Sequence, residues 1–277
     1  MRNYVNYLLI IAVVFLNGCA SQFIRPGTSH PTDGNTYQLP DSSIYQGETK
    51  DGLFQGKGNL SWRNGEQYTG HFKKGLFDGI GRLDTAGGDV YQGYFHDGMF
   101  EGEGILTLKN GDQYHGNFEK DQFNGKGTFL FHNGDRYDGD FKNGNFEGTG
   151  RLVLKDQGIY HGGFKDGLFE GNGIFVYVNG QRYEGKFHQG YYDGKGSMDY
   201  PSGARYIGEF HNGKKQGKGK FIWPSGDYYV GEFDKDMKHG AGICRIRSVV
   251  ANCLYKNDNL IFFGKPQNTD DDQRFRT

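Results

Sequence analysis

The sequence predicts an all-β fold, an elongated single-layer antiparallel array of stacked β-hairpins with a degenerate C-terminal cap. The first observation is a tyrosine, followed two residues later by glycine, that recurs every 23 residues without insertion or deletion. A constant spacing of this size is typical of a repeat array. The nine tyrosines are Tyr45, Tyr68, Tyr91, Tyr114, Tyr137, Tyr160, Tyr183, Tyr206 and Tyr229.

The second observation is a period of two inside each repeat, counted from the tyrosine as position 0. Positions 0, 2 and 4 read Tyr, Gly and Phe, with Thr49 as the exception at position 4, and the residues between them are mostly polar. Positions 15 and 17 are mostly apolar, as in Leu106 and Leu108. This alternation is typical of strands, so we expect two strands per repeat with the aromatic rings on the inner face.

The third observation is the regular placement of turn dipeptides. Asp97-Gly98 and Asn143-Gly144 separate the two halves of their repeats, whereas Asn110-Gly111 and Asn133-Gly134 join one repeat to the next. Asn-Gly and Asp-Gly tolerate the positive φ angles that tight hairpin turns require. Each repeat is therefore expected to be a β-hairpin that pairs with the following one.

The nine repeats resemble the membrane occupation and recognition nexus (MORN) family. The shared pattern is Tyr-x-Gly-x-aromatic, then Gly, then Gly-x-Gly and an apolar pair, and it extends over residues 45–251. The resemblance implies an accessory array that occurs in proteins of many kinds. It therefore specifies the fold more closely than any activity.

The N-terminus has the layout of a secretion signal over residues 1–18. Arg2 precedes an apolar run from Tyr7 to Leu16, which is shorter than the about 20 residues that a membrane-spanning helix needs. The run ends in Leu-Asn-Gly-Cys, which resembles the bacterial lipobox. This resemblance implies cleavage before Cys19 and attachment of a diacylglycerol thioether and an N-acyl chain, such as palmitate, to that cysteine.

The residues after the lipidated cysteine predict where the protein is held. Ala20 and Ser21 follow Cys19 in place of the aspartate that retains lipoproteins in the inner membrane of enteric-type bacteria. The expected location is therefore the bacterial cell envelope, at the outer membrane and facing the periplasm. Residues 19–44, counted from the lipidated cysteine, are rich in Ser, Thr, Pro, Gly and Asn, which is typical of a flexible tether.

At the other end of the chain the repeat pattern decays. Residues 252–263 are expected to form a capping hairpin, because terminal repeats must cover an exposed apolar end, and residues 264–277 are expected to be disordered. Cys244 and Cys253 flank the last turn on adjacent predicted strands. They are a possible disulfide in an oxidising compartment, although the sequence does not show whether their side chains face each other.

Composition and motifs favour a non-catalytic protein. We find no nucleophile, metalloprotease or phosphate-loop motif, and we expect no catalytic residue, cofactor or metal site. The formal net charge is −1, with 32 basic and 33 acidic residues, which argues against nucleic-acid binding. The possible partner surface, which could equally be a solvated edge, consists of Tyr191, Tyr192, Lys214, Lys215, Lys218 and Lys220.

These observations predict a membrane-anchored, extracytoplasmic surface that binds or scaffolds a protein or another envelope component. Two alternatives stay open at this point. One is an accessory subunit of a lipid-kinase-like or other enzyme, although few residues lie outside the repeats, and the other is a structural spacer of the envelope. The sequence names neither the partner nor the oligomeric state.

Overall fold

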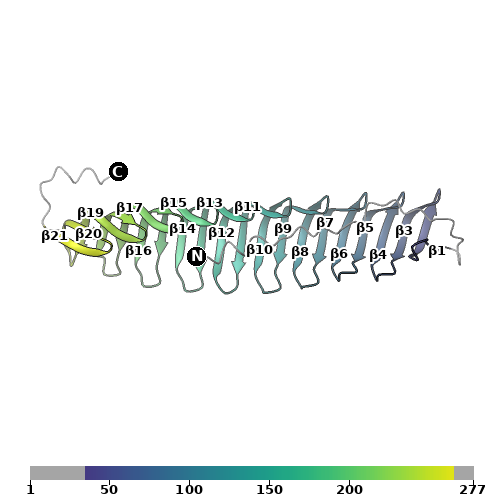
Figure 1. The fold of residues 1–277 in the computed structure, drawn as a ribbon, viewed down its shortest axis with the longest axis horizontal. Helices are drawn as coiled ribbons and strands as arrows, with labels where there is room; N and C mark the ends of the chain where they lie inside the picture. The colour runs from purple at the N-terminus through teal and green to yellow at the C-terminus, as the bar shows by residue number, and fades with distance from the viewer. Residues whose placement is uncertain (1–34, 265–277) are drawn as a thin grey trace. The chain divides into compact units, whose positions relative to one another are not determined.

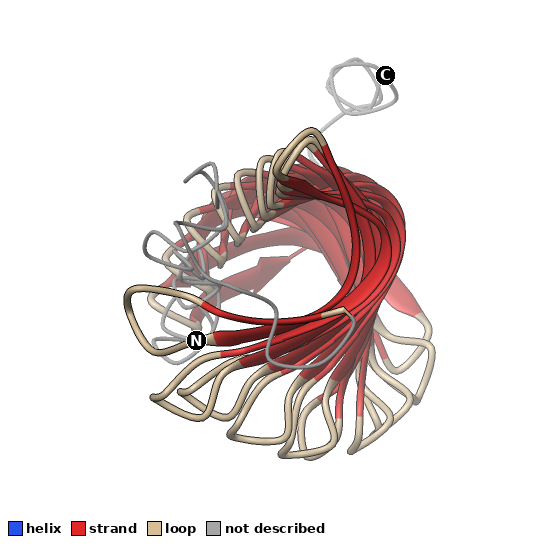
Figure 2. Ribbon diagram, turned by 90° about the vertical axis from the view of Figure 1, so that its right-hand side faces the viewer, coloured by secondary structure: helices blue, strands red, loops and turns tan. Residues whose placement is uncertain are grey.

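The computed structural model describes residues 35–264, and in this range it contains strands, turns and loops but no helix (Figure 2). The chain divides into two compact units, residues 35–155 and residues 156–264 of the described range. The predicted all-β repeat array of stacked hairpins is confirmed.

In residues 35–155, the strands pair antiparallel in the order of the sequence, from β1 with β2 to β10 with β11 (Figure 1). Each repeat contributes one shorter and one longer strand. The strands are β1 (Thr36–Gln38), β2 (Ile44–Lys50), β3 (Leu53–Ser61), β4 (Gln67–Lys73), β5 (Leu76–Asp84), β6 (Val90–His96), β7 (Met99–Thr107), β8 (Gln113–Glu119), β9 (Gln122–Leu130), β10 (Arg136–Lys142) and β11 (Asn145–Leu154).

Residues 156–264 follow the same antiparallel order and end in one additional hairpin. The cap was expected at residues 252–263, and this hairpin overlaps that range, with Asn257 and Asp258 at its turn. The strands are β12 (Gly158–Lys165), β13 (Leu168–Tyr177), β14 (Arg182–His188), β15 (Tyr191–Asp199), β16 (Arg205–His211), β17 (Lys214–Ile222), β18 (Tyr228–Asp234), β19 (Met237–Ile246), β20 (Val249–Lys256) and β21 (Asn259–Gly264).

The turn chemistry explains why the strands alternate so regularly. The turn between β6 and β7 consists of Asp97 and Gly98, with φ angles of 48° and 84°. Positive φ at both central residues gives a tight turn whose twist matches that of the flanking strands. In the longer loop between β7 and β8, the Asn110 side chain accepts a hydrogen bond of 3.0 Å from the Asp112 N–H. The predicted tight turn inside the repeat is confirmed, whereas the connection between repeats is a longer loop in which Gly111 alone of the predicted Asn-Gly pair has a positive φ angle.

The core consists of stacked aromatic rings that pass from one repeat to the next. Tyr91, 1% exposed, stacks on Phe100 with a centroid distance of 3.6 Å. Phe95 of the same repeat and Phe118 of the next repeat meet the Tyr91 ring edge-on, at 5.0 and 5.1 Å. Edge-to-face and offset-stacked pairs of this kind are worth about 0.5–1.5 kcal/mol beyond their burial. Each repeat thus completes its aromatic cluster with a ring from its neighbour.

Two glycines lie beneath each of these tyrosine rings. Gly116 and Gly127, at positions 2 and 13 of the fourth repeat, are paired across β8 and β9. A Cβ atom added to Gly127 would lie 2.6 Å from Cε2 and from the hydroxyl oxygen of Tyr114, and no real Cβ atom tolerates such a distance. The glycines therefore leave the space that the ring occupies.

The same tyrosines also bind the backbone. The Tyr114 hydroxyl donates a hydrogen bond of 2.8 Å to the Asn117 carbonyl, next to a bulge in the pairing of β8 with β9. The corresponding bond forms in all nine repeats, at 2.7–3.0 Å. Because a buried hydroxyl without a partner is costly, this bond is what makes tyrosine rather than phenylalanine suitable at position 0.

The start of the array differs from the prediction, because ordered structure begins inside the expected tether of residues 19–44. Strand β1 pairs with β2, and the Tyr37 ring lies 6.1 Å from the Tyr45 ring. The Tyr37 hydroxyl is 3.2 Å from Oγ1 of Thr49, the residue that replaces phenylalanine at position 4. Tyr37 thus covers the first aromatic cluster where the repeat itself lacks a ring. The rest of the predicted tether, up to residue 34, and the predicted tail lie outside the described residues, apart from Gly264.

We expect Gly127→Val to lower the free energy of unfolding by about 2–4 kcal/mol, because the new side chain would displace the Tyr114 ring. Lys142→Gln is the matched control in the same unit, since Lys142 is exposed at the end of β10, and it should change stability by less than about 0.5 kcal/mol. The midpoint of urea unfolding, followed by circular dichroism, measures both. Equal losses at the two positions would show that the inner and outer faces are assigned wrongly.

We also expect stability to fall steeply above about pH 10. Burial raises the pKa of all nine position-0 tyrosines, that of Tyr229 to about 12, whereas a tyrosine in the unfolded chain has a pKa of about 10. Above about pH 10 the native state therefore binds more protons than the unfolded state. The resulting stability is fully present below this pH, and each tyrosine then removes up to about 1.4 kcal/mol per pH unit.

Urea midpoints between about pH 9 and about pH 11.5 test this expectation. Tyr137→Phe is the control: it should be less stable at neutral pH and should show a shallower alkaline slope, because one titrating group is gone. A midpoint that stays constant across this range would contradict the burial of the tyrosine hydroxyls.

Candidate functional site

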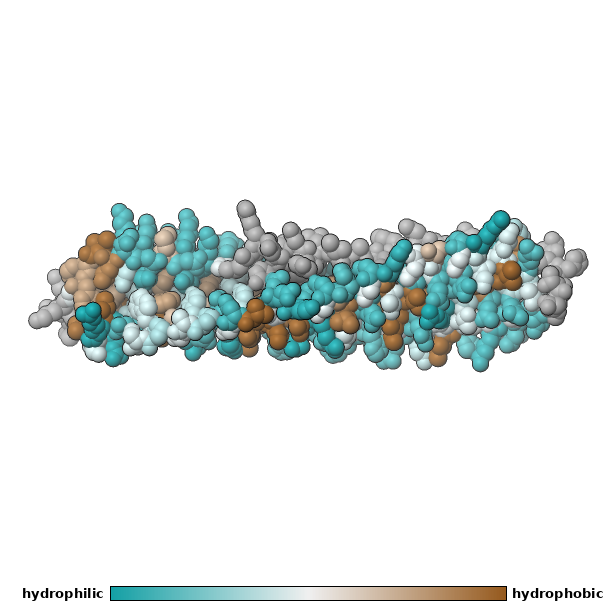
Figure 3. Space-filling view, turned by 90° about the horizontal axis from the view of Figure 1, so that it is seen from below, coloured by the Kyte–Doolittle hydropathy of each residue, from teal (hydrophilic) through white to brown (hydrophobic). Residues whose placement is uncertain are grey.

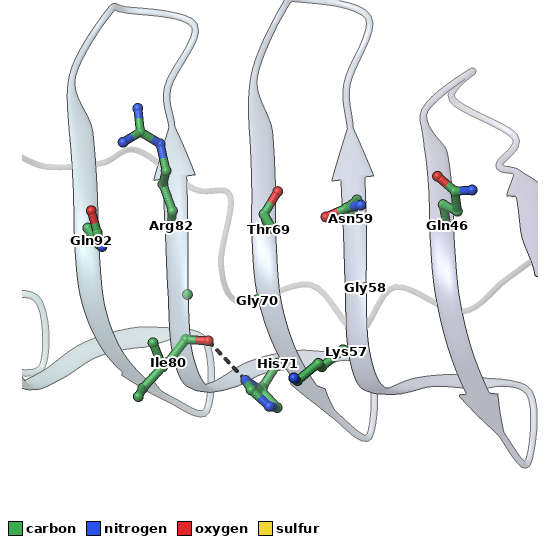
Figure 4. Close-up of a pocket in the computed structure, with 11 residues that line it drawn as sticks. Gln46, Lys57, Gly58, Asn59, Thr69, Gly70, His71, Ile80, Arg82 and Gln92 are labelled. Atoms are coloured by element: carbon green, nitrogen blue, oxygen red, sulfur yellow. Dashed lines mark hydrogen bonds between the residues drawn. The ribbon is translucent and has the colours of Figure 1, made fainter.

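The outer face of the repeats carries positions 1, 3, 12 and 14, which flank the paired glycines. In residues 35–155, these positions line a groove of about 500 Å³ across β2 to β6. Figure 4 shows two rows of side chains with glycines between them. The first row consists of Gln46, Asn59, Thr69, Arg82 and Gln92, and the second of Lys57, His71 and Ile80. The glycine backbone forms the floor, and the rows supply hydrogen-bond donors and acceptors along the groove.

Residues 156–264 have a corresponding groove of about 650 Å³ across β14 to β19. Its side chains are more charged and more apolar than those of the first groove. They are Glu184, Lys195, Ser197, Arg205, Ile207, Glu209, Lys218, Lys220, Val230, Glu232 and Ala241.

Two predicted partner residues, Lys218 and Lys220, therefore lie in this charged groove. The Lys220 ammonium is 4.6 Å from the centroid of the Tyr228 ring, a cation–π distance. Ile207, on the neighbouring strand, is 45% exposed. Cations beside an exposed apolar side chain form a surface that can bind acidic and apolar groups together.

The other predicted partner residues do not join this groove. Tyr191 is half-buried and Lys214 is exposed, each next to a hairpin turn. Tyr192 was expected on the surface but is 4% exposed, because it occupies the core position 9 and stacks on Tyr183 at 3.7 Å. That expectation was wrong for Tyr192. Lys215 occupies the same position 9 of the next repeat and is half-buried.

Lys215 takes the place of the stacked ring in the eighth repeat. Its Nζ atom lies 5.4–5.9 Å from the centroids of four aromatic rings, those of Tyr200, Tyr206, Phe221 and Phe233. Burial lowers the pKa of Lys215, and the carboxylates of Asp236 and Asp258 partly oppose this effect. Lys215 is therefore a half-buried ammonium that lies among aromatic rings at cation–π distances.

Sequence reasoning missed a second half-buried lysine, Lys238, at position 9 of the ninth repeat. Its ammonium is 2.6 Å from Oδ1 of Asp258 and 5.4 Å from the Trp223 ring centroid. The hydrogen bond and charge of Lys238 help to hold the pKa of Asp258 below its usual value. The signal that could have found it is position 9 itself, which is aromatic in the first seven repeats and lysine in the last two.

The cysteines lie at two different ends of the chain. Cys244 of β19 and Cys253 of β20 have Cα atoms 5.8 Å apart, and a disulfide joins their side chains. The two residues are diagonal neighbours, since Cys244 pairs with Ala251 and Cys253 pairs with Gly242. Both side chains are buried. Cys19, the predicted lipidation site, lies outside the described residues.

Several histidines at position 5 lie beside carboxylates of the preceding repeat. The Nδ1 atoms of His188 and His211 are 3.1 and 3.0 Å from carboxylate oxygens of Glu170 and Asp193. His96 lies between two aspartates, 3.3 Å from Asp78 and 3.6 Å from Asp97. Asp78, His96 and Asp97 could together supply ligand atoms to a metal ion. Both ring nitrogens of His96 already face a carboxylate, however, and His96 and Asp97 are exposed. The arrangement is that of exposed ion pairs.

Between residues 35 and 264, the structure contains no helix of the length and apolar character that crossing a membrane requires.

Comparison with solved structures found likenesses of low identity. One is the TCP10 domain of Danio rerio CPAP in complex with a STIL peptide, at 13% identity and a TM-score of 0.46, covering 81% of this chain and 99% of that domain. Another is the SAS-4 TCP domain of Drosophila melanogaster with a proline-rich motif of Ana2, at 13% identity and a TM-score of 0.26, covering 74% and 94%. Similarity at this level supports no functional argument. Comparison with curated proteins found no match.

A family model described as the MORN repeat matches nine consecutive segments. They are residues 45–67, 68–90, 91–113, 114–136, 137–159, 160–182, 183–205, 206–228 and 229–248. The matches begin at the position-0 tyrosines and confirm the resemblance found in the sequence. They cover well over half of the residues, and the chain belongs to the MORN repeat family.

Proposed function

We propose that this chain is a lipid-anchored, extracytoplasmic scaffold that binds a protein or another envelope component on its outer face. Membership of the MORN family and the β-repeat fold suggest a binding or scaffolding role. The proposal adds the anchor, the location and the surface used. The sequence supports the first two through the lipobox that ends at Cys19.

The observation that carries the binding role is the contrast between the two faces. Positions 0, 2 and 13 keep the same residue in all nine repeats, because ring, glycines and backbone must fit together. Position 1, on the outer face, changes from Gln46 through His115 to Val230. A constant frame with a variable outer face is suited to presenting different side chains at regular intervals to a long partner.

The groove of residues 156–264 is the favoured contact surface. It combines the ammonium groups of Lys218 and Lys220 with three glutamates and the exposed side chain of Ile207, whereas the groove of residues 35–155 is mainly polar and carries Lys57 and Arg82 as its charged side chains. The partner chemistry that fits is an acidic surface with apolar groups, such as an acidic protein segment. A spacer would use the same frame, but its effect would depend on the number of repeats rather than on these side chains.

The anchor is tested by Cys19→Ala, which should abolish metabolic labelling with palmitate because the acylated atom is gone. A second variant, in which an ordinary cleavable signal peptide replaces residues 1–19, should be exported and should leave the membrane fraction. This second variant is needed because an uncut signal could itself hold the chain. Retention of the re-targeted variant in the membrane at the native level would show that something other than lipid anchors it.

The contact surface is tested by Lys218→Glu combined with Lys220→Glu. We expect this double variant to reduce recovery of the native partner by more than about tenfold in proximity labelling from intact cells, since like charges now oppose an acidic surface. Lys50→Glu combined with Lys142→Glu is the control of equal charge change in residues 35–155, since both lysines are exposed and neither lines a groove. Deletion of residues 91–136, two whole repeats, should preserve recovery.

Two results would contradict this assignment. If the control lowers recovery as much as the groove variant, net charge rather than the groove governs binding. If deletion of residues 91–136 abolishes the cellular phenotype while both charge variants leave it intact, the protein acts as a spacer.

A further inference from the structure

Strands β20 and β21 carry an unusual concentration of exposed apolar side chains. Of the 15 exposed large hydrophobic residues in the described part of the chain, six lie in these two strands. We call them the terminal apolar patch: Val249, Val250, Leu254, Leu260, Ile261 and Phe262. Figure 3 shows brown surface gathered at the left end, where Figure 1 places β21. Gathered apolar surface of this kind marks an interaction site more often than scattered residues do.

The patch borders a strand edge. Within residues 35–264, β21 pairs with β20 alone, so its other edge presents backbone N–H and C=O groups that no described strand binds. The six residues of β21 include no charged side chain. Proteins usually protect such an edge with charges, proline or a very short strand. At the opposite end of the sequence, β1 has this protection, since it is three residues long and carries no aliphatic side chain.

The sequence that follows β21 is a poor match for the patch. Residues 265–277 begin Lys-Pro and contain six charged side chains among thirteen residues, including Asp270, Asp271 and Asp272. Proline cannot donate a ladder hydrogen bond, and burying aspartates against Ile261 and Phe262 would be costly. A covering element should instead be a strand without charge that has apolar side chains of its own.

We propose that β21 pairs antiparallel with β21 of a second copy of this chain, which makes the protein a two-fold dimer. An antiparallel pair of identical strands is self-complementary, because the two-fold axis brings each donor of one edge opposite an acceptor of the other. The absence of charge in β21 means that no like charges meet across the axis. The exposed side chains of Ile261 and Phe262 then face their counterparts in the partner copy.

The proposed interface is small, since it consists of one six-residue edge and the adjacent patch from each copy. Interfaces at the low end of the size range are weak or transient. The dimer should therefore depend on concentration, and a single charge in the patch should disrupt it. It requires neither the lipid anchor nor a binding partner, so it can fail or succeed independently of the proposed function.

Cysteine cross-linking of the full chain in intact cells tests the proposal. Cysteines introduced one at a time at Leu260, Ile261 and Phe262, treated with a short bifunctional maleimide, should yield a product of twice the chain mass for at least one position. Adding Leu254→Glu to the same chain should lower that product by about tenfold or more, because Leu254 pairs with Phe262 of β21 and the new carboxylate would be buried without a partner beside the paired edges. Ile207→Cys, also on an exposed isoleucine, is the matched control and should give no dimer product.

A second measurement keeps the proposal open to refutation if a variant folds poorly. The unmodified full chain, extracted in mild detergent, should sediment as a dimer that dissociates on dilution. A monomer at every concentration together with no cross-link at the three patch positions would overturn the proposal. Equal cross-linking at Ile207→Cys would do the same, since it would indicate random collision rather than paired edges.

Discussion

The fit of one tyrosine over two glycines is the interaction on which every repeat depends. The Tyr114 ring needs the space above Gly116 and Gly127, and its hydroxyl needs the carbonyl of Asn117, so ring, sheet and bulge specify one another. Losing the glycines removes the space, and losing the hydroxyl leaves a bulge carbonyl without its donor. The aromatic stacking that joins successive repeats rests on this local arrangement, because it requires each ring to be held at a constant height and angle.

Most of the fold could be predicted from the sequence, because the repeat states each local rule nine times. The position-0 tyrosines, the alternation and the Asp-Gly turns together determined strands, faces and register. Strand β1 could not be predicted, since Tyr37 lies outside the repeat pattern and its role depends on the missing ring at Thr49. The candidate site was predicted less well. The aromatic and basic side chains of Tyr192 and Lys215 suggested that both lie on the surface. Both residues occupy position 9, however, whose side chains point toward the aromatic rings of the inner face.

The two faces of the sheet have different roles, the inner one in packing and the outer one in presenting side chains. The inner face accepts little change, and even the lysines that replace rings in the last two repeats are held by aromatic contacts or by Asp258. The outer positions differ in charge, size and polarity among the nine repeats, because their side chains point away from the rings. Surface chemistry can therefore vary from repeat to repeat without altering the backbone, which explains how two grooves on the same frame, one polar and one charged, occur within one chain.

The ring shared between neighbours has an evolutionary consequence. Phe118 completes the cluster around Tyr91 of the preceding repeat just as Phe95 completes the cluster around Tyr68. Where neighbouring repeats share a ring in this way, the contacts between them are the same at each boundary. Duplicating or deleting a segment that encodes 23 residues therefore recreates the same contacts, wherever in the repeat the break falls. The ends of the described array differ from these junctions, because Tyr37 at the start and the disulfide-linked cap at the other end each close a cluster once. Genes of this type can therefore change length by unequal recombination while their ends stay constant.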